Sequence, residues 1–382
     1  MNRSPLTILA ALILLSPTFA RAAGERRPNL GLELRAGERA AAPHAPMAPA
    51  LEDQDEDDKG RARAAAQEPQ SYDEAVRDFE KNIDELRPDV KNAENLPFLM
   101  THGVKTKRSI LMVHGLTDSP YYMKALAKTF FEQGYNVVAV LLPGHGTKPE
   151  DLLHVLLREW REEVEYGMSI AEQLGEEVSL AGFSTGGALV VDALNRNFSS
   201  RAEPRRLGGL YLFSPALKIA NPNAYQACIP GATLLRPWVQ DHADQIVEDH
   251  PYRYRKMATN AVCQLYKQTF INATFRHQTM NHLAERGIPV FAVQSQADNQ
   301  VSSDAVDEFM RDAGRLPNGP ATDYISYPRE AGIPHADVTR PESNPAFGQL
   351  ETRLKAFLAR REAAIPPNGQ IRRATAEPPT SE

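Results

Sequence analysis

The stretch Gly182-Phe183-Ser184-Thr185-Gly186 stands between an apolar run and a segment of helix-forming residues. The run before it, residues 177–181, is Glu-Val-Ser-Leu-Ala, and residues 187–194 after it are Gly-Ala-Leu-Val-Val-Asp-Ala-Leu. This order indicates a strand, a sharp turn and a helix, which is the context that a nucleophile elbow requires. Glycines flank the serine because a Cβ there would collide with the neighbouring strand or helix. The sequence therefore predicts that Ser184 is a nucleophile rather than an ordinary turn serine.

A His-Gly turn after an earlier buried strand is expected to complete the oxyanion site. Residues 109–113 (Ser-Ile-Leu-Met-Val) form an apolar run typical of a strand in a parallel sheet. The run is followed by His114-Gly115-Leu116-Thr117-Asp118-Ser119-Pro120. In an elbow of this kind, one oxyanion donor comes from such a turn and the other is the N–H directly after the nucleophile. We therefore expect the backbone N–H groups of Leu116 and Thr185 to converge on the substrate oxygen.

The other two members of a catalytic triad are expected at later strand ends. Residues 288–293 (Ile-Pro-Val-Phe-Ala-Val) indicate a buried strand, and Asp298 follows it before a predicted helix. Residues 323–327 indicate the next strand, and His335 lies in the loop beyond it, ahead of a C-terminal helix. Ser184, Asp298 and His335 thus follow one another in the chain order of nucleophile, acid and base that this arrangement requires. That order predicts a Ser-His-Asp triad.

Other acidic residues and histidines compete for the roles of Asp298 and His335. Asp298 also suits an ordinary capping role, but it alone follows the strand directly, whereas its competitors are Asp304, Asp323 and Asp337. The competing histidines are His102, His114, His145 and His154. Of these, His114 and His145 precede the elbow in glycine-containing loops. We expect those two to shape the oxyanion region and the floor of the pocket.

Three motifs together resemble those of a known family. They are residues 114–120, Leu142-Pro143-Gly144-His145-Gly146 and residues 182–187, and they look like α/β-hydrolases of the bacterial carboxylesterase and monoacylglycerol lipase type, over roughly residues 96–360. The resemblance implies an α/β-hydrolase fold, with a mostly parallel sheet flanked by helices and a cap insertion. It also implies hydrolysis of short- or medium-chain carboxylic esters or monoacylglycerols without a cofactor. Members of this group often have Met or Leu at the position of Thr185, whose branched side chain is expected to alter the acyl pocket.

Two other functions remain open. The proline-aminopeptidase and haloperoxidase branches share these motifs, so amide or peptide cleavage is an alternative to ester cleavage. An aminopeptidase needs an acidic group to hold the substrate α-amine, and Glu248 and Asp249 are available in the insertion. A non-catalytic binding protein on the same fold is the third hypothesis, because fold alone does not fix function. The complete set of predicted triad residues argues against it.

Composition excludes several kinds of partner. The 382 residues carry a net charge of −6 without a basic patch, so no nucleic-acid partner is expected. Apolar runs alternate with amphipathic stretches, which favours an α/β arrangement. The acidic block at residues 52–58 lacks the spacing of a calcium-binding loop. We expect no metal at this block, and the family resemblance implies a small-molecule ester or lipid substrate and no cofactor, while the oligomeric state stays open.

The chain divides into a leader, a linker, one folded domain and a tail. Residues 1–22 combine a basic start, a short apolar run and an Ala-x-Ala site, which predicts a cleaved signal peptide and a periplasmic or secreted protein. The run is too short to span a bilayer comfortably, and a short uncleaved anchor is the alternative. Residues 23–70 and 366–382 are expected to be disordered because they contain few apolar side chains. Residues 71–365 are predicted to form the hydrolase domain.

Residues 217–283 interrupt the strand–helix alternation and are predicted to form a cap over the nucleophile. Most of the cap aromatics are expected to bury the cap against the core, and an acyl-binding wall of aromatics is the alternative. Cys228 and Cys263, the two cysteines of the chain, both lie in this segment. In an exported protein they are expected to pair, contributing about 3 to 4 kcal/mol on the chain-entropy model. Two unpaired buried thiols are the alternative.

Overall fold

The computed structural model describes residues 68–239, 250–316, 319 and 321–364. The predicted signal peptide at residues 1–22, nearly all of the linker at 23–70 and the tail at 366–382 lie outside the described residues. Residues 240–249 of the cap, with Glu248 and Asp249, also lie outside them. In the described ranges, no helix has the length and apolar character needed to cross a membrane.

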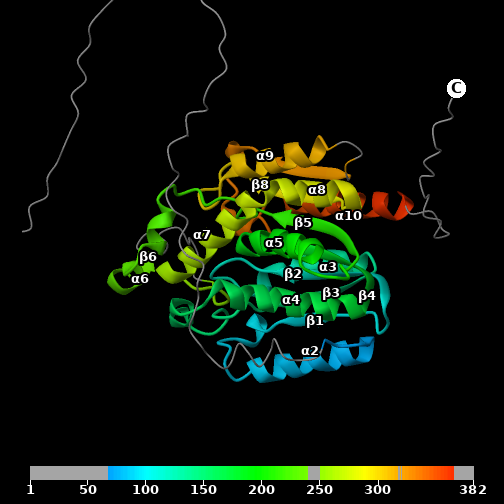
Figure 1. Ribbon diagram of the computed structural model, residues 1–382, viewed down its shortest axis with the longest axis horizontal. Coiled ribbons are helices and arrows are strands. Elements are labelled where there is room, and N and C mark those ends of the chain that lie inside the picture. Colours follow the sequence, from blue (N-terminus) through cyan, green and yellow to red (C-terminus); the bar gives the residue numbers. More distant parts are fainter. Residues whose placement is uncertain (1–67, 240–249, 317–318, 320, 365–382) are drawn as a thin grey trace, which may run out of the picture. The chain divides into compact units, whose positions relative to one another are not determined.

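A seven-stranded sheet forms the centre of the described domain (Figure 1). Its strand order is β1-β3-β2-β4-β5-β8-β9, and only the edge pair β1 and β3 is antiparallel. Parallel neighbours cannot be joined by a tight hairpin, so helices carry the chain from one strand to the next. The strands are β1 (Phe98–Met100), β2 (Thr106–Val113), β3 (Tyr135–Val140), β4 (Gly175–Phe183), β5 (Leu207–Phe213), β8 (Val290–Ser295) and β9 (Thr322–Tyr327).

Helices cover both faces of this sheet and create two hydrophobic cores (Figure 1). On β2, Leu111 and Val113 belong to one core, whereas Ile110 and Met112 belong to the other. This division follows from the strand geometry, in which successive side chains point to opposite faces. Because both faces are covered, the inner strands β3, β5 and β8 are buried along nearly their whole length rather than on alternate residues.

The helices divide between the two faces. The first core is covered by α4 (Leu157–Leu174), α5 (Thr185–Ser199) and α9 (Ser303–Gly314), with α2 (Tyr72–Leu86) packed on α4. The second core is covered by α3 (Lys124–Glu132) and α10 (Phe347–Ala364). Short 3-10 helices complete the connections: η1 (Ala93–Asn95), η2 (Pro120–Met123), η3 (Pro149–Leu153), η6 (Arg329–Ala331) and η7 (His335–Asp337). The predicted α/β-hydrolase fold class is confirmed.

The predicted cap segment, residues 217–283, contains several short elements and one long helix. They are η4 (Ala224–Cys228), α6 (Ala232–Leu235), the two-stranded ribbon of β6 (Trp238–Val239) and β7 (Met257–Ala258), α7 (Thr259–Thr274) and most of α8 (Arg276–Arg286). In Figure 1, α6 and β6 lie at the left beside α7. A disulfide between Cys228 and Cys263 joins η4 to α7. The last helix, α8, packs on α5 and α9 and so extends the helical layer of the main domain.

Candidate active site

The elbow holds Ser184 in a backbone conformation that few residues adopt. β4 ends at Phe183, α5 begins at Thr185, and Ser184 between them has a φ of 52°. Such a conformation costs energy and persists only where the surrounding structure fixes it. Here the Ser184 N–H donates to the carbonyl of Phe213 (3.0 Å), and its carbonyl accepts from the N–H of Ala216 (2.8 Å). Strand β5 and the residues after it therefore hold the turn in place.

The glycines of the elbow allow α5 to approach the sheet closely. A Cβ added at Gly186 would lie 2.0 Å from the carbonyl oxygen of Val113 in β2. One added at Gly182 would lie 2.3 Å from the backbone of Gly186. Both contacts are with backbone atoms, which cannot turn aside as a side chain can. The steric reason predicted for these two glycines is therefore visible in the structure.

His335 lies between Ser184 and Asp298. Its Nε2 is 2.8 Å from the Ser184 Oγ, and its Nδ1 is 2.6 Å from the Asp298 Oδ2. An ionised carboxylate only accepts hydrogen bonds, so Nδ1 carries the proton and donates to Asp298. The Nε2 lone pair then accepts from the Ser184 hydroxyl. This arrangement places a base on the serine and an acid behind the base.

Asp298 is held in its ionised form by hydrogen bonds. Burial alone would raise the pKa of this carboxyl, but His335 and two backbone N–H groups together hold the pKa below its usual value. Those N–H groups, from Gln300 (2.8 Å) and Val301 (3.0 Å), both donate to Oδ1. The Gln294 side-chain amide donates to Oδ2 at 3.0 Å. The carboxylate therefore has a fixed orientation toward the imidazole.

The loop that carries His335 is tied to the end of a strand. Ser295, the last residue of β8, donates its hydroxyl to the carbonyl of Ile333 at 2.7 Å. The His335 ring also packs beside Phe183, with ring centroids 5.1 Å apart. These two contacts bring the predicted base to the elbow from 151 residues further along the chain.

The other residues considered for the roles of Asp298 and His335 do not lie between Ser184 and its partners. Asp304 is in the first turn of α9, Asp323 pairs with Arg353 and Arg360, and Asp337 pairs with Arg340. His102 stacks on Phe131 with ring centroids 4.1 Å apart, and His154 ends η3. Among the described histidines, His335 is the one within hydrogen-bond distance of Ser184.

His114 and His145 are buried and do not line the cavity at Ser184, so the prediction that they form the floor of the pocket is wrong. His114 Nδ1 donates to the carbonyl of Gly115 (2.8 Å), and its Nε2 accepts from the N–H of Leu142 (3.0 Å). Burial lowers the pKa of His114 well below its usual value, and the nearby His145 lowers it further. Burial also lowers the pKa of His145 to about 4. His114 thus connects the turn after β2 with the turn after β3, and the His145 ring packs edge-on against it with ring centroids 4.9 Å apart.

The two predicted oxyanion donors are available for a ligand. Thr185 is the first residue of α5, and Leu116 lies in the turn after β2. In the described part of the chain, neither backbone N–H donates a hydrogen bond. The first N–H groups of a helix have no partner within the helix, and the helix dipole favours negative charge near them. Both observations suit the stabilisation of a developing oxyanion.

A cavity of about 460 Å³ opens at Ser184, and we call it the triad pocket. One part of its wall is aliphatic and comes mainly from the cap and the loop after Asp298: Ile219, Met257, Val262, Leu265 and Val301. Its polar lining includes Asp118, Arg253, Asn299 and Gln300. An apolar wall with a few polar groups beside a nucleophile is typical of a small-molecule site.

Two possibilities raised by the sequence for the wall of the triad pocket are not found among the described residues. The cap aromatics do not form it, and several of them are well exposed, including Tyr225, Phe270 and Phe275. The side chain of Thr185 is fully buried and does not line the pocket either. The aliphatic residues of α7 take the place of an aromatic wall.

Sequence reasoning missed two charged residues of the triad pocket. Asp118 and Arg253 form a buried ion pair, with Arg253 Nη2 3.0 Å from Asp118 Oδ1. Asp118 stands in the motif at residues 114–120, but nothing in the sequence connects it with a cap residue 135 positions away.

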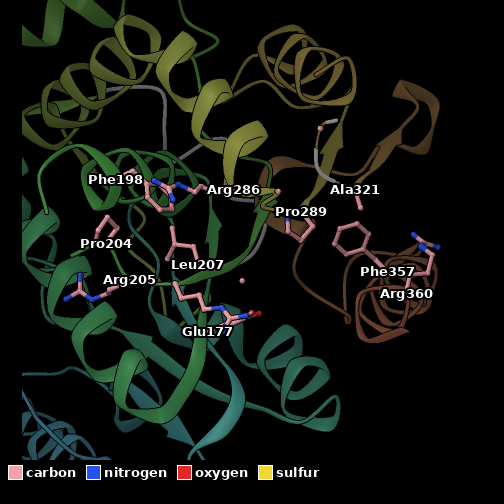
Figure 2. A pocket seen from close by; sticks show the side chains of 14 residues that line it. Glu177, Phe198, Pro204, Arg205, Leu207, Arg286, Pro289, Ala321, Phe357 and Arg360 are labelled. Carbon is pink, nitrogen blue, oxygen red and sulfur yellow. The ribbon is translucent and has the colours of Figure 1, made fainter. Parts of the chain in front are cut away.

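A larger hollow of about 770 Å³ lies at the opposite edge of the sheet, and we call it the amino-edge groove. Figure 2 shows its lining, which includes residues at or before the starts of β4, β5, β8 and β9: Glu177, Leu207, Pro289 and Ala321. Four arginines also line it, and each has a partner: Arg205 with Glu165 and Glu172, Arg206 with Glu177, Arg286 on the ring of Phe198, and Arg360 with Asp323.

The described residues contain no group of three or more His, Cys, Asp or Glu side chains able to hold a metal ion.

Two curated bacterial proteins are similar to part of this chain. A thermostable monoacylglycerol lipase of Bacillus sp. (strain H-257) is 33% identical over 109 residues, which are 28% of this chain and 42% of that protein. A carboxylesterase of Bacillus subtilis (strain 168) is 32% identical over 92 residues, which are 24% of this chain and 36% of that protein. The chain thus spans less than half the length of either relative.

Solved structures share the fold at low identity. One comes from work on LipS and LipT, two metagenome-derived lipolytic enzymes, with a TM-score of 0.53 and 21% identity, covering 69% of this chain and 97% of that chain. Another is a soluble variant of monoglyceride lipase from Saccharomyces cerevisiae in complex with a substrate analogue. Its TM-score is 0.52 at 15% identity, and the match covers 70% of this chain and 91% of that chain.

A family model gives the widest sequence match. The Hydrolase_4 model, described as "Serine aminopeptidase, S33", matches residues 104–318. This range runs from before β2 to beyond α9, includes Ser184 and Asp298, and covers more than half of the chain. The chain therefore belongs to the Hydrolase_4 family of α/β-hydrolases.

Proposed function

We propose that this protein is a serine hydrolase that cleaves carboxylic esters, either short- to medium-chain esters or monoacylglycerols. The observation that carries the proposal is the continuous contact from Asp298 through His335 to Ser184, at 2.6 and 2.8 Å, at the mouth of a partly aliphatic cavity. The named relatives, a monoacylglycerol lipase and a carboxylesterase, support the choice of an ester substrate.

The first half of the proposed reaction forms an acyl-enzyme. His335 Nε2 takes the proton of Ser184 as the serine oxygen attacks the ester carbonyl carbon. The carbonyl oxygen becomes an oxyanion, which the N–H groups of Leu116 and Thr185 stabilise. Asp298 stabilises the imidazolium that forms. When the C–O bond to the leaving alcohol breaks, His335 returns its proton to that alcohol.

The second half repeats these steps with water. His335 takes a proton from the water molecule, and the resulting hydroxide attacks the acyl-enzyme carbonyl. The tetrahedral intermediate collapses, the Ser184 oxygen leaves, and His335 protonates it. The carboxylic acid product then departs, and the serine is ready for another cycle. The aliphatic wall of the triad pocket suits the acyl chain, because burying its methylene groups is favourable at about 0.8 kcal/mol each.

The test is hydrolysis of p-nitrophenyl esters from acetate to palmitate by the full mature protein, beside Ser184→Ala. We expect the wild type to turn over short or medium chains and the variant to lose turnover by about 10⁵-fold or more, as nucleophile removal does in serine hydrolases. A fluorophosphonate probe should label the wild type and leave the variant unlabelled. Undiminished hydrolysis by a folded Ser184→Ala protein would contradict the nucleophile assignment.

Amide cleavage is tested in the same experiment with aminoacyl p-nitroanilides. The family description is a serine aminopeptidase, but Asp118, the carboxylate that lines the triad pocket among the described residues, which do not include Glu248 and Asp249, is paired with Arg253. We therefore expect ester turnover to exceed anilide turnover. The reverse preference, with Ser184 still required, would establish the aminopeptidase.

Export to the periplasm or the medium is a further part of the proposal. The N-terminal pattern at residues 1–22 supports it, as does the Cys228–Cys263 disulfide, since disulfides persist in oxidising compartments. Expression in the native host followed by cell fractionation tests it. A cytoplasmic protein with an intact N-terminus would overturn this part alone.

A further inference from the structure

The turn at residues 115–118, which carries the predicted oxyanion donor Leu116 and which we call the oxyanion turn, is strained. It closes through a hydrogen bond from the Asp118 N–H to the carbonyl of Gly115 at 3.2 Å. Thr117, in the middle of the turn, has a φ of 68°. For a β-branched residue this conformation is an outlier, and it costs on the order of 1 to 3 kcal/mol. The turn therefore needs support from the structure around it.

Two consecutive residues of the cap supply contacts to two consecutive residues of the turn. The Tyr254 N–H donates to the carbonyl of Thr117 at 2.8 Å. Next to it, the Arg253 guanidinium lies against the Asp118 carboxylate, with Nε 3.1 Å and Nη2 3.0 Å from Oδ1. One contact holds the backbone of the turn and the other holds a side chain. Because the paired residues are adjacent in both segments, the contacts restrain the position and the rotation of the turn together.

The cap segment is itself fixed to the body of the enzyme. The Tyr254 hydroxyl accepts from the N–H of Thr147 (2.8 Å) and donates to the carbonyl of Gly144 (3.2 Å). Those two residues lie in the loop after β3, next to the buried His145. The Arg253 guanidinium lies 4.5 Å from the centre of the Tyr122 ring. The cap segment that contacts the oxyanion turn is thus anchored by hydrogen bonds to the loop after β3.

The Asp118–Arg253 pair is buried. The side chains of Arg253 and Asp118 are only 6% and 5% exposed. In such a pair, removal of one partner leaves the other buried without its compensating contact, so without Arg253 the Asp118 side chain loses the group that fixes its orientation. The backbone N–H of Asp118 closes the turn that holds Leu116, so a fixed Asp118 side chain helps to hold the donor in place.

We propose that Arg253 is a positioning residue, which holds the oxyanion turn through Asp118 while Tyr254 holds it through Thr117. The inference rests on the proposed serine-hydrolase function. It adds that a cap residue, outside the triad and the oxyanion hole, sets the position of one of the two oxyanion donors. Its effect is on the rate of acylation rather than on the binding of substrate.

The experiment compares Arg253→Met and Arg253→Lys with wild type, in kcat and KM, on the ester that the wild type turns over best. A lost oxyanion donor lowers kcat by about 10² to 10³. For a displaced one we expect Arg253→Met to lower kcat by roughly 10- to 100-fold, with KM changed by about twofold or less. Arg253→Lys, which keeps the charge, should recover part of the loss. Arg276→Met is the matched control, because it breaks an Arg–Asp pair between α8 and α9 at 2.8 Å, away from the triad pocket.

Two further measurements distinguish positioning from a structural or binding role. Asp118→Asn should also lower kcat, and the double variant Asp118→Asn/Arg253→Met should be close to the worse single variant, because both act through one contact. The rate of inactivation by a fluorophosphonate should fall in parallel with kcat, since phosphonylation uses the same oxyanion donors. Circular dichroism checks the fold of each protein; if Arg253→Met does not fold, Arg253→Lys and Asp118→Asn carry the test.

Several results would overturn the proposal. Unchanged kcat in folded Arg253 variants would do so, as would a raised KM at constant kcat, which would make Arg253 a substrate-binding residue. Strict additivity of the two substitutions would show that they act independently. Failure of the proposed function is a separate result, because the wild-type protein itself would then lack ester turnover and fluorophosphonate labelling.

Discussion

The two edges of the central sheet carry hollows that differ in size and in chemistry. The amino-edge groove is the larger, at about 770 Å³ against about 460 Å³ for the triad pocket. Its arginines, however, are each occupied by a carboxylate or a ring. At the carboxyl edge, Ser184 lines the cavity with His335 Nε2 2.8 Å from its hydroxyl, and in the described part of the chain the N–H groups of Leu116 and Thr185 donate no hydrogen bond. Polar groups that are held in place and have no partner therefore indicate a candidate reactive site, whereas the volume of a hollow does not.

The largest expected difference between the edges is in turnover. Asp298→Asn should lower kcat by about 10⁴, because the amide favours the wrong imidazole tautomer, as it does in serine proteases. Glu177→Gln, which removes a carboxylate of the amino-edge groove, should leave kcat unchanged. Steady-state ester hydrolysis measures both. Equal losses in the two variants would remove the distinction between the edges.

A second difference lies in how tightly the backbone packs. Gly186→Ala should destabilise the fold by about 3 kcal/mol or more, because its Cβ would meet the Val113 carbonyl at 2.0 Å. Gly208→Ala, at the start of β5, should cost about 1 kcal/mol or less, because the nearest atoms belong to the side chains of Ser179 (3.1 Å) and Glu177 (3.2 Å). Urea unfolding of both proteins provides the comparison. A smaller loss in Gly186→Ala than in Gly208→Ala would contradict this account.

Acid should lower the free energy of unfolding through a buried histidine near the carboxyl edge. The pKa of His145 is about 4 in the folded state and about 6.5 when unfolded, so its contribution to stability is complete above pH 6.5 and is lost as the pH falls toward 4. Between pH 7 and pH 5 we expect the free energy of unfolding to fall by about 2 kcal/mol from this residue. Burial acts in the same direction on His114.

The check is urea unfolding at pH 7, 6 and 5 for the wild type and His145→Asn, which keeps a donor near the Nδ1 position. The variant should lose less stability across this range, whatever its absolute stability at pH 7. A slope identical to that of the wild type would show that His145 is not responsible.

The smallest effect is expected on the rim of the amino-edge groove. Arg206 pairs with Glu177 at 2.8 Å, but its side chain is 72% exposed. Exposed pairs of this kind contribute about 0 to 1 kcal/mol. Arg206→Met should therefore change the free energy of unfolding by less than about 1 kcal/mol and leave kcat unchanged. A change of several kcal/mol, measured by urea unfolding, would mean that the groove is structurally more important than its exposure indicates.

Local features of the carboxyl edge were predictable from the sequence. The elbow is short in sequence, and its two glycines, its serine and the strand and helix around it lie within residues 177–194. The chain order of nucleophile, acid and base then restricts the choice among distant residues. Asp298 and His335 follow strand ends, and the parallel arrangement of β5, β8 and β9 brings those ends to one edge of the sheet.

Contacts that depend on the cap were not predictable in the same way. The pairing of Asp118 with Arg253 crosses 135 residues and has no periodic pattern to reveal it. The wall of the triad pocket is aliphatic because α7 lies over it, presenting Val262 and Leu265. Aromatic content of the cap says nothing about which face of α7 turns inward. The antiparallel pairing of β1 at the edge likewise depends on tertiary packing rather than on local sequence.

The Cys228–Cys263 bridge turns residues 229–262 into a covalently closed loop. A single protease cut in that loop would leave the two halves of the chain linked, and they would migrate separately only after reduction. Arg253 and Tyr254 lie inside the closed loop, as do β6 and β7. After such a cut, Arg253 and Tyr254 would stay joined to the body through one end of the loop, and the bridge would hold the other end in place, so cleavage there need not release the cap.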